Sequence, residues 1–555
     1  MRLALPATIG AFVLSVLATA PPAPAQDAAW ALANARIETV TKGVIERGTI
    51  VVRDGLIVAV GADVTPPADA RVLDLSGRTV YPGLIDLISS LGIAAPPAPA
   101  SGRAAAQAAP PAEGAPVGLE PDRMVADEFR PQAADVKNLR DGGITAVLTA
   151  PTRGAFRGLS ALVPLRDSLT ARSTIRSPVA VQLGFEGAQG FRYPATLLGV
   201  IAYERQAFYD ARRQGLLQDR YRTNPRGMER PAYDAHLAAL IPVVRGELPA
   251  FFAARSEEEI RRAVSIGREF GLKLTVVGAT EGFRAIDALR AMGQPAVVSV
   301  DFPKAADVTG WQYRWTERHA PGDSAAADSA ARPVVEGNAA ALQRAGISFA
   351  LASGGSLRPA EFLANVRKAI AAGLPRDVAL QALTIRPAEI AGVGEQLGSI
   401  EAGKIANLVV TEGDLLGDSA KIRDVFVDGT RYEVIAPAPP PGGRRGAAAG
   451  AEPAAELGGT WDVTVSTPQG SNQATMTVTQ SGTSFTGQMT TEMGSTQVDN
   501  GQVTGQSASW AITLSMGGQS MTITFHGDVE GNRMRGSADI PGMGSANFTA
   551  QKRTP

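Results

Sequence analysis

The chain has 555 residues, and its 53 Lys plus Arg against 54 Asp plus Glu leave a formal net charge of −1. This length predicts two or three domains. The balanced charge gives no reason to expect nucleic acid or an anionic membrane as a partner. The chain has no cysteine, which excludes disulfides, thiolate catalysis, thiolate metal sites and a lipid anchor on Cys.

The N-terminus has the pattern of a secretory signal peptide. Arg2 precedes an apolar core over residues 9–18, and small residues at a usual cleavage spacing end at Ala25. An uncleaved membrane anchor is the alternative, but Pro and Gly interrupt a run barely long enough to span a bilayer. We therefore predict a signal peptide over residues 1–25 and a periplasmic or secreted protein with no membrane anchor after cleavage.

Short strands and turns are predicted from Trp30 to Val80. The runs 48–53 and 56–60 flank Asp54-Gly55, a dipeptide typical of a type I′ hairpin turn. The stretch 79–92 follows, with the sequence TVYPGLIDLISSLG. It is a β-type run that ends in Pro-Gly and continues into a second apolar run with one carboxylate.

Helical and β-type runs alternate through the middle of the chain, which predicts parallel strands with covering helices. One predicted helix begins with a capping box at Ser256 and Glu259 and ends at Gly271. Another is predicted over residues 359–372. Ala/Pro-rich residues 94–117 and the polar segment 321–331 are predicted to be loops. The candidate strands are residues 144–149, 179–185, 249–254, 274–277, 296–300 and 348–352.

The last hundred residues form a different pattern. Residues 436–456 are a Pro/Gly/Ala-rich linker without hydrophobic periodicity. Beyond it Trp461, Val463 and Val465 alternate with polar residues, and later runs repeat the alternation between Gly, Ser and Asn breaks. This spacing predicts an up-and-down antiparallel barrel or sandwich.

Two separated motifs resemble the amidohydrolase superfamily, in particular its imidazolonepropionase-like branch. They are PGLID at residues 82–86 and LGSIEAGKIANLVV at residues 397–410, and the resemblance extends over roughly residues 30–432. It implies an α/β fold: a (β/α)8 TIM-like barrel with a small β-sandwich built from segments on either side of it. Gly459-Thr460-Trp461 resembles the opening of small lipocalin-like barrels. The domains expected are 26–80 with 391–435 (composite β-sandwich), 81–390 (barrel), 436–457 (linker) and 458–555 (C-terminal all-β barrel).

The same resemblance implies a divalent metal such as zinc, held by His-x-His after PGLID, by a Lys or Glu on strand four, by one His each on strands five and six, and by an Asp on strand eight. Such a metal lowers the pKa of a bound water for hydrolysis. Here Ile88 and Ser90 occupy the His-x-His positions. The whole chain has three histidines, whereas the usual site needs four, so we expect no metal and no other cofactor.

The three histidines are predicted to have local roles. His236 faces solvent or caps a turn, His319 lies beside a polar loop, and His526 sits in a turn at a strand end. Other polar residues follow the predicted strands and are candidates to line the barrel mouth: Asp86, Thr149, Gln182, Arg255, Asp301, Lys304 and Ser353.

Each mouth candidate has a structural alternative. Asp86 belongs to the family motif without being a usual ligand and is expected to have a structural role. Asp301 with Lys304 is a possible acid/base pair or an ordinary salt bridge. Arg255 either holds a carboxylate ligand by two parallel hydrogen bonds or begins a helix as a solvated charge.

Three functional hypotheses remain open. By resemblance the protein is a hydrolase of non-peptide C–N bonds such as cyclic amides, but without metal ligands it is predicted to be catalytically degenerate and to bind a ligand or partner. The second hypothesis is an active hydrolase with an atypical carboxylate-based site. The third is a small-molecule binding protein that acts through an apolar lumen in its C-terminal barrel. The expected partner is a small molecule or a protein, and a homo-oligomer is possible.

Overall fold

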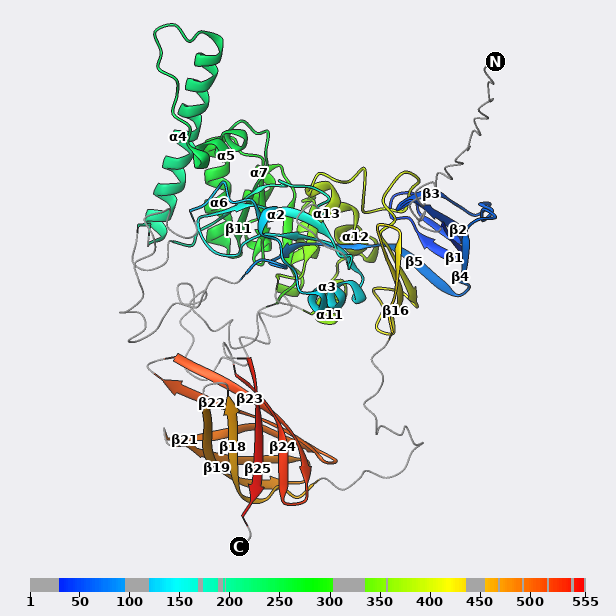
Figure 1. Ribbon diagram of the computed structural model, residues 1–555, viewed down its shortest axis with the longest axis vertical. Coiled ribbons are helices and arrows are strands. Elements are labelled where there is room, and N and C mark those ends of the chain that lie inside the picture. The colour runs from blue at the N-terminus through cyan, green and yellow to red at the C-terminus, as the bar shows by residue number, and fades with distance from the viewer. Residues whose placement is uncertain are drawn as a thin grey trace, which may run out of the picture. The chain divides into compact units, whose positions relative to one another are not determined.

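The computed structural model describes residues 29–94, 119–167, 173–187, 193–194, 196–302, 335–355, 358–435, 455–467, 470–491, 494–516, 519–540 and 544–553. The chain divides into two compact units, Met1–Ala436 and Pro437–Pro555 (Figure 1). The predicted signal peptide, residues 436–454 of the predicted linker, His319 and Lys304 lie outside the described residues. No helix in the described part of the chain is both long and apolar enough to cross a membrane.

One mixed sheet joins segments from both sides of the barrel. Val410 pairs with Val80 where β15 runs antiparallel to β5, so residues more than three hundred positions apart share one sheet. The turn between β2 and β3 has positive φ at both Asp54 and Gly55, which confirms the predicted hairpin. The order is β17-β16-β15-β5-β1-β2-β3, with β4 on β1. The strands are β1 (Trp30–Glu38), β2 (Val44–Arg53), β3 (Leu56–Gly61), β4 (Arg71–Asp74), β5 (Arg78–Pro82), β15 (Leu408–Glu412), β16 (Lys421–Val427) and β17 (Thr430–Glu433).

A buried tyrosine connects this sheet to the barrel. Tyr81, at the end of β5, is fully buried, and its hydroxyl donates a 3.2 Å hydrogen bond to Asp414. Arg376 also donates to Asp414, with Nε 2.7 Å from Oδ2. Burial raises the pKa of Tyr81 to about 12, so the phenol stays a donor at physiological pH.

The first unit has eight strand positions around a barrel, filled in order by β6, β7, β8 with β9, β10, β11, β12, β13 and β14. The strands from β10 to β14 pair in parallel, as do β6 and β7, and β14 packs against β6 to close the ring. The bounds are β6 (Leu84–Ser89), β7 (Ile144–Thr149), β8 (Phe156–Leu159), β9 (Ala161–Pro164), β10 (Val181–Gly184), β11 (Ala250–Ala254), β12 (Leu274–Gly278), β13 (Ala296–Ser299) and β14 (Phe349–Ala352).

The third position departs from the predicted alternation of parallel strands. β9 pairs antiparallel to β7, and β8 pairs antiparallel to β10. Only residues 150–155 connect β7 to β8. A parallel crossover needs a dozen or more residues, so the chain has to return in the opposite direction. The expectation of parallel strands with covering helices is therefore confirmed elsewhere in the barrel and wrong for residues 156–164.

Helices cover the barrel strands, and their caps agree with the sequence. Both bonds of the capping box between Ser256 and Glu259 are present, and Gly271 ends that helix with φ 65°. The long α4 projects beside α5 (Figure 1). The helices are α2 (Val125–Glu128), α3 (Ala133–Asp141), α4 (Leu197–Thr223), α5 (Ala235–Val244), α6 (Glu257–Phe270), η1 (Gly282–Arg284), α7 (Ile286–Met292), α10 (Asn338–Arg344), α11 (Pro359–Ala371), α12 (Arg376–Leu383) and α13 (Ile385–Ile390).

The second unit is a closed antiparallel barrel with a filled interior. The Trp510 ring stacks on Phe525 at 5.0 Å between centroids, and Phe485 and Phe548 meet it edge-on. His526 lies within β23, so its predicted position in a turn is wrong; the turn comes later, at Gly531. The strands are β18 (Gly459–Thr467), β19 (Gly470–Ser481), β20 (Ser484–Thr491), β21 (Gly494–Thr504), β22 (Ser507–Met516), β23 (Gln519–Glu530), β24 (Arg533–Ile540) and β25 (Gly544–Lys552).

The close approach at Gly83 gives a stability prediction. A Cβ at Gly83 would lie 2.1 Å from Thr145 Oγ1 and 2.4 Å from its Cγ2. We expect Gly83→Ala to lower the free energy of unfolding by about 1–3 kcal/mol, because the overpacked core has to shift. Urea denaturation followed by far-UV circular dichroism of the helices measures the change.

The paired control is Thr145→Ala, alone and combined with Gly83→Ala. Since this substitution removes the two nearest atoms, Gly83→Ala should cost less in the Thr145→Ala background than in the natural chain. An equal cost in both backgrounds would contradict the assigned contact.

Candidate functional site

Asp86 is the buried acid at the point where the barrel closes. Its side chain comes from β6, it is 2% exposed, and it faces the residue that follows β14. Its Oδ1 accepts hydrogen bonds from the backbone N–H of Ile88 at 3.1 Å and of Ser353 at 3.2 Å. Its Oδ2 accepts from the Ser353 hydroxyl. Asp86 and Ser353, two of the predicted mouth residues, are thus in direct contact.

Burial dominates the electrostatics of this acid. Desolvation raises the pKa of Asp86 to about 6, and the bonds from Ser353 and Ile88 oppose that rise. The Ser353 hydroxyl in turn accepts a 3.1 Å bond from the Gly355 N–H. The carboxyl group therefore links the first and last strands of the ring, which is the structural role expected of it.

A cavity of about 690 Å³ opens beside this contact. It lies at the carboxyl ends of β6 and β14, where (β/α)8 barrels place their functional groups. Parts of α3 and the start of α11 form its other side. Among the residues that line it are Asp86, Ile88, Ser90, Arg130, Asp135, Ser353 and Arg358.

Two arginines give the cavity its basic groups, and sequence reasoning missed both. Arg130 and Arg358 are exposed at its wall, and neither forms an ion pair with any described residue. Arg130 donates to the carbonyl of Phe129 at 2.7 Å. The acidic Glu128 at the same wall is bound to Arg123. Arg130 follows α2, and Arg358 directly precedes α11. Neither residue ends a strand, so a search confined to strand ends could not find them.

The other predicted mouth residues have local partners. Thr149 donates a 2.6 Å bond to the carbonyl of Leu91, and Gln182 donates to Ser160 at 2.9 Å. Arg255 is exposed just before α6, and its backbone N–H donates to Glu259 at 2.8 Å.

Asp301 lies near the cavity without lining it. A Cβ at Gly354 would meet its side chain at 2.7 Å, and its own N–H donates to Ser299. The proposed pairing with Lys304 falls outside the described residues, so it stays a prediction.

A second charged group lies at the third and fourth strand positions. Arg157 on β8 reaches over Gly184 and has Glu186 at 3.8 Å. Nearby Glu204 on α4 is fully buried, and neither carboxylate oxygen has a hydrogen-bond partner among the described residues. Desolvation raises the pKa of Glu204 well above its usual range, and the charges of Arg157 and Arg205 oppose that rise.

A divalent metal does not fit the residues at the family's ligand positions. Ile88 and Arg255 offer no lone pair to a cation, and Gly278 ends β12 without a side chain. Asp86, the nearest carboxylate, is taken up by three hydrogen bonds. In the described part of the chain, no three His, Asp or Glu side chains are placed to hold a metal together.

The described histidines lie away from this cavity. His236 lies at the start of α5, and its Nε2 is 3.3 Å from Asp122. The side chain is partly exposed, so its surroundings are local ones. His526 belongs to the second unit.

Fold and strand-end geometry together define a (β/α)8-type barrel in which no group of described His, Asp or Glu side chains at the strand ends is placed to hold a metal. Residues 251–437 match the model of the amidohydrolase family. The chain thus contains an amidohydrolase-family domain. A crystal structure of an amidohydrolase from Thermotoga maritima MSB8 has the same fold, with a TM-score of 0.60 and 23% identity over 73% of this chain and 99% of that one.

Sequence similarity to curated relatives is confined to short segments. One segment of 58 residues is 45% identical to amidohydrolase tasK of Hapsidospora irregularis. Another of 62 residues is 44% identical to the imidazolonepropionase of Mesorhizobium japonicum. Each match covers 10% of this chain, and they span 6% and 15% of the two relatives.

The raised pKa of Asp86 predicts a pH dependence of stability. Its folded pKa of about 6 lies above the ordinary value of 3.8, so between these values the folded state binds a proton that the unfolded state releases. The contribution of Asp86 to the free energy of unfolding should therefore fall by on the order of 2 kcal/mol as pH rises through this window.

Asp86→Asn keeps an acceptor for both N–H groups and has no proton to release. The stability of the natural protein relative to Asp86→Asn, measured by urea denaturation at a series of pH values, should decline from pH 3.8 to about 6 and then level. Asp135→Asn, at an exposed carboxyl of the same cavity, is the control. A difference that does not vary with pH would contradict the burial of an ionisable Asp86.

Proposed function

We propose that this protein is an exported ligand-binding protein built on an amidohydrolase-type barrel, and that it has lost metal-dependent hydrolysis. The observation that carries the proposal is which residues stand on β6 and directly after it, where the family has its first metal ligands. Ile88 and Ser90 stand where ligands would be needed, and the one carboxylate of β6 is engaged by Ser353 and by backbone N–H groups.

The chemistry of the cavity supports binding of a small polar molecule with an anionic group. Its volume of about 690 Å³ lies in the range of small-molecule sites. Arg130 and Arg358 present guanidinium groups without ion-pair partners among the described residues, and guanidinium is suited to bidentate recognition of carboxylates.

A second candidate function rests on the contact between Asp86 and Ser353. The Ser353 hydroxyl donates to a buried carboxylate at the edge of the cavity, and a carboxylate can take the proton of a nucleophilic serine. This arrangement would supply an atypical hydrolase with a nucleophile, Ser353, and with a base, Asp86. Against it, Ser353 is only 5% exposed, and its hydroxyl also closes the barrel.

Metal content is the first test of the lost metal site. The mature protein, purified without chelator and without a histidine tag, should carry less than about 0.1 equivalent of zinc, manganese or iron. Dialysis against a chelator should leave its melting temperature unchanged, because no bound metal stabilises the fold. About one equivalent of metal, lost together with stability on chelation, would refute the proposal.

Ligand chemistry is tested with acetate, succinate and benzoate in thermal-shift titrations. At least one of these carboxylates should raise the melting temperature, because a ligand that binds only the folded state stabilises it. Arg130→Ala and Arg358→Ala should each reduce the shift. Arg213→Ala, which removes an exposed arginine of α4, should leave it intact. Equal shifts in all four proteins would place the binding elsewhere.

An activated-serine probe separates the two candidate functions. A fluorophosphonate should leave the natural protein unlabelled if Ser353 only closes the barrel. Labelling that Ser353→Ala abolishes, while Ser90→Ala retains it, would favour the hydrolase instead.

A further inference from the structure

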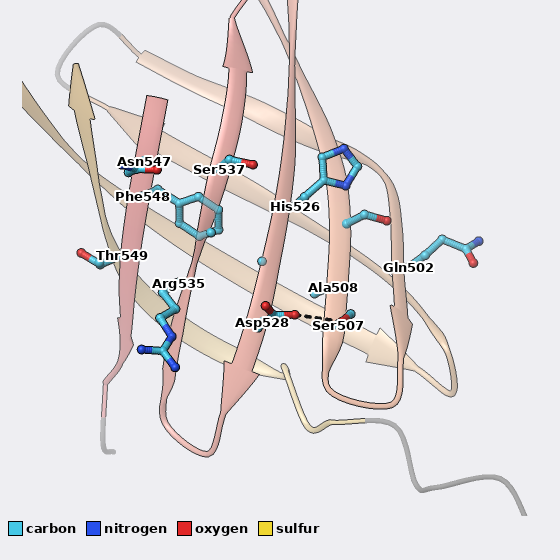
Figure 2. A pocket seen from close by; sticks show the side chains of 13 residues that line it. Gln502, Ser507, Ala508, His526, Asp528, Arg535, Ser537, Asn547, Phe548 and Thr549 are labelled. Carbon is cyan, nitrogen blue, oxygen red and sulfur yellow. Dashed lines mark hydrogen bonds between the residues drawn. The ribbon is translucent and has the colours of Figure 1, made fainter. Parts of the chain in front are cut away.

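The outer wall of the C-terminal barrel carries a second hollow, unrelated to the cavity of the amidohydrolase-type barrel. It has a volume of about 840 Å³ and lies across β22, β23, β24 and β25 (Figure 2). Its polar lining side chains project outward, whereas Ala508 and Phe548 of the lining belong to the buried core. The interior of this barrel is filled by Trp510 and its neighbours, so the apolar lumen that a lipocalin-like site would need is occupied.

Strand register arranges the polar side chains of the hollow in two rows. In the first row Ser509 is opposite His526, His526 is opposite Ser537, and Ser537 is opposite Asn547. Side chains directly opposite in an antiparallel sheet are about 5 Å apart. The row therefore presents a hydroxyl, an imidazole, a hydroxyl and an amide along a line that crosses four strands.

The second row lies two residues along each strand. Ser507 is opposite Asp528, Asp528 is opposite Arg535, and Arg535 is opposite Thr549. Ser507 donates a 2.9 Å bond to Asp528 (Figure 2). The one acid and the one permanent cation among the lining residues are thus cross-strand neighbours, and Arg535 forms its ion pair with Glu530 at 2.8 Å.

Two glycines form the floor between the rows. Gly527 and Gly536 are paired across β23 and β24. A Cβ at Gly527 would lie 2.8 Å from the ring of Phe548, and one at Gly536 would lie 1.9 Å from the carbonyl oxygen of His526. Both glycines and the core residue Phe548 are among the residues that line the hollow.

We propose that this hollow binds an uncharged oligosaccharide. Hydroxyl, amide and imidazole groups can each donate and accept hydrogen bonds, and sugar hydroxyls also do both. Because the Arg535 guanidinium is already paired with Glu530, the cation among the lining residues does not favour an anionic ligand. Four strands at about 4.8 Å spacing make a surface roughly 14 Å wide, long enough for a chain of several sugars rather than one.

Calorimetric titration of the full chain with maltohexaose, cellohexaose and xylohexaose tests the proposal. At least one of these should bind. The double variant His526→Ala/Asn547→Ala should weaken that binding about tenfold or more, since two hydrogen bonds are lost. Both residues are exposed, so the variant should keep the circular dichroism spectrum of the natural chain.

A matched control removes two outward polar side chains from another part of the same wall. Thr477 and Gln488 are exposed and opposite each other on β19 and β20, and Thr477→Ala/Gln488→Ala should bind as the natural chain does. Failure of all three sugars to bind would overturn the proposal, as would equal weakening by both double variants. Tighter binding of an oligogalacturonate would overturn the expectation of an uncharged ligand.

Discussion

The hydrogen bonds between Asp86 and Ser353 are the contact on which the barrel depends. They connect β6 with the residue that follows β14, so the first and last strands of the ring are joined through one carboxylate and two donors of Ser353, while a third donor, the Ile88 N–H, comes from β6 itself. A carboxylate buried without partners would carry a large desolvation cost. Here the donors and the raised pKa reduce that cost, because near pH 6 the group can take up a proton rather than remain charged.

The same contact shapes the chemistry of the cavity. A carboxylate that ties two strands together is not free to position a cation, and its neighbours Ile88 and Ser90 do not replace one. The basic groups at the cavity wall are Arg130 and Arg358, and the acidic Glu128 and Asp135 lie at the same wall. The fold of the family is retained although residues without metal-binding side chains stand at its ligand positions, and fold alone would not have indicated this difference.

Much of the fold was predictable from local pattern. The Asp54-Gly55 turn, the capping box of α6 and the alternation of Trp461, Val463 and Val465 depend on neighbouring residues, and the structure confirms each of them. The antiparallel return over residues 156–164 was missed, although the short connection before it already required one. The position of His526 was also wrong, because Gly527 beside it lies within β23 rather than in a turn.

The sequence by itself determined that the chain has the amidohydrolase motifs and too few histidines for the usual site, since both follow from residue identity alone. Only the tertiary structure decided which polar groups meet. Asp86 and Ser353 are separated by 267 positions, and Arg130 and Arg358 come from different segments of one cavity wall. The glycine-floored hollow likewise depends on cross-strand register. Such contacts are set by ring closure and strand pairing, which act over distances that local sequence patterns do not encode.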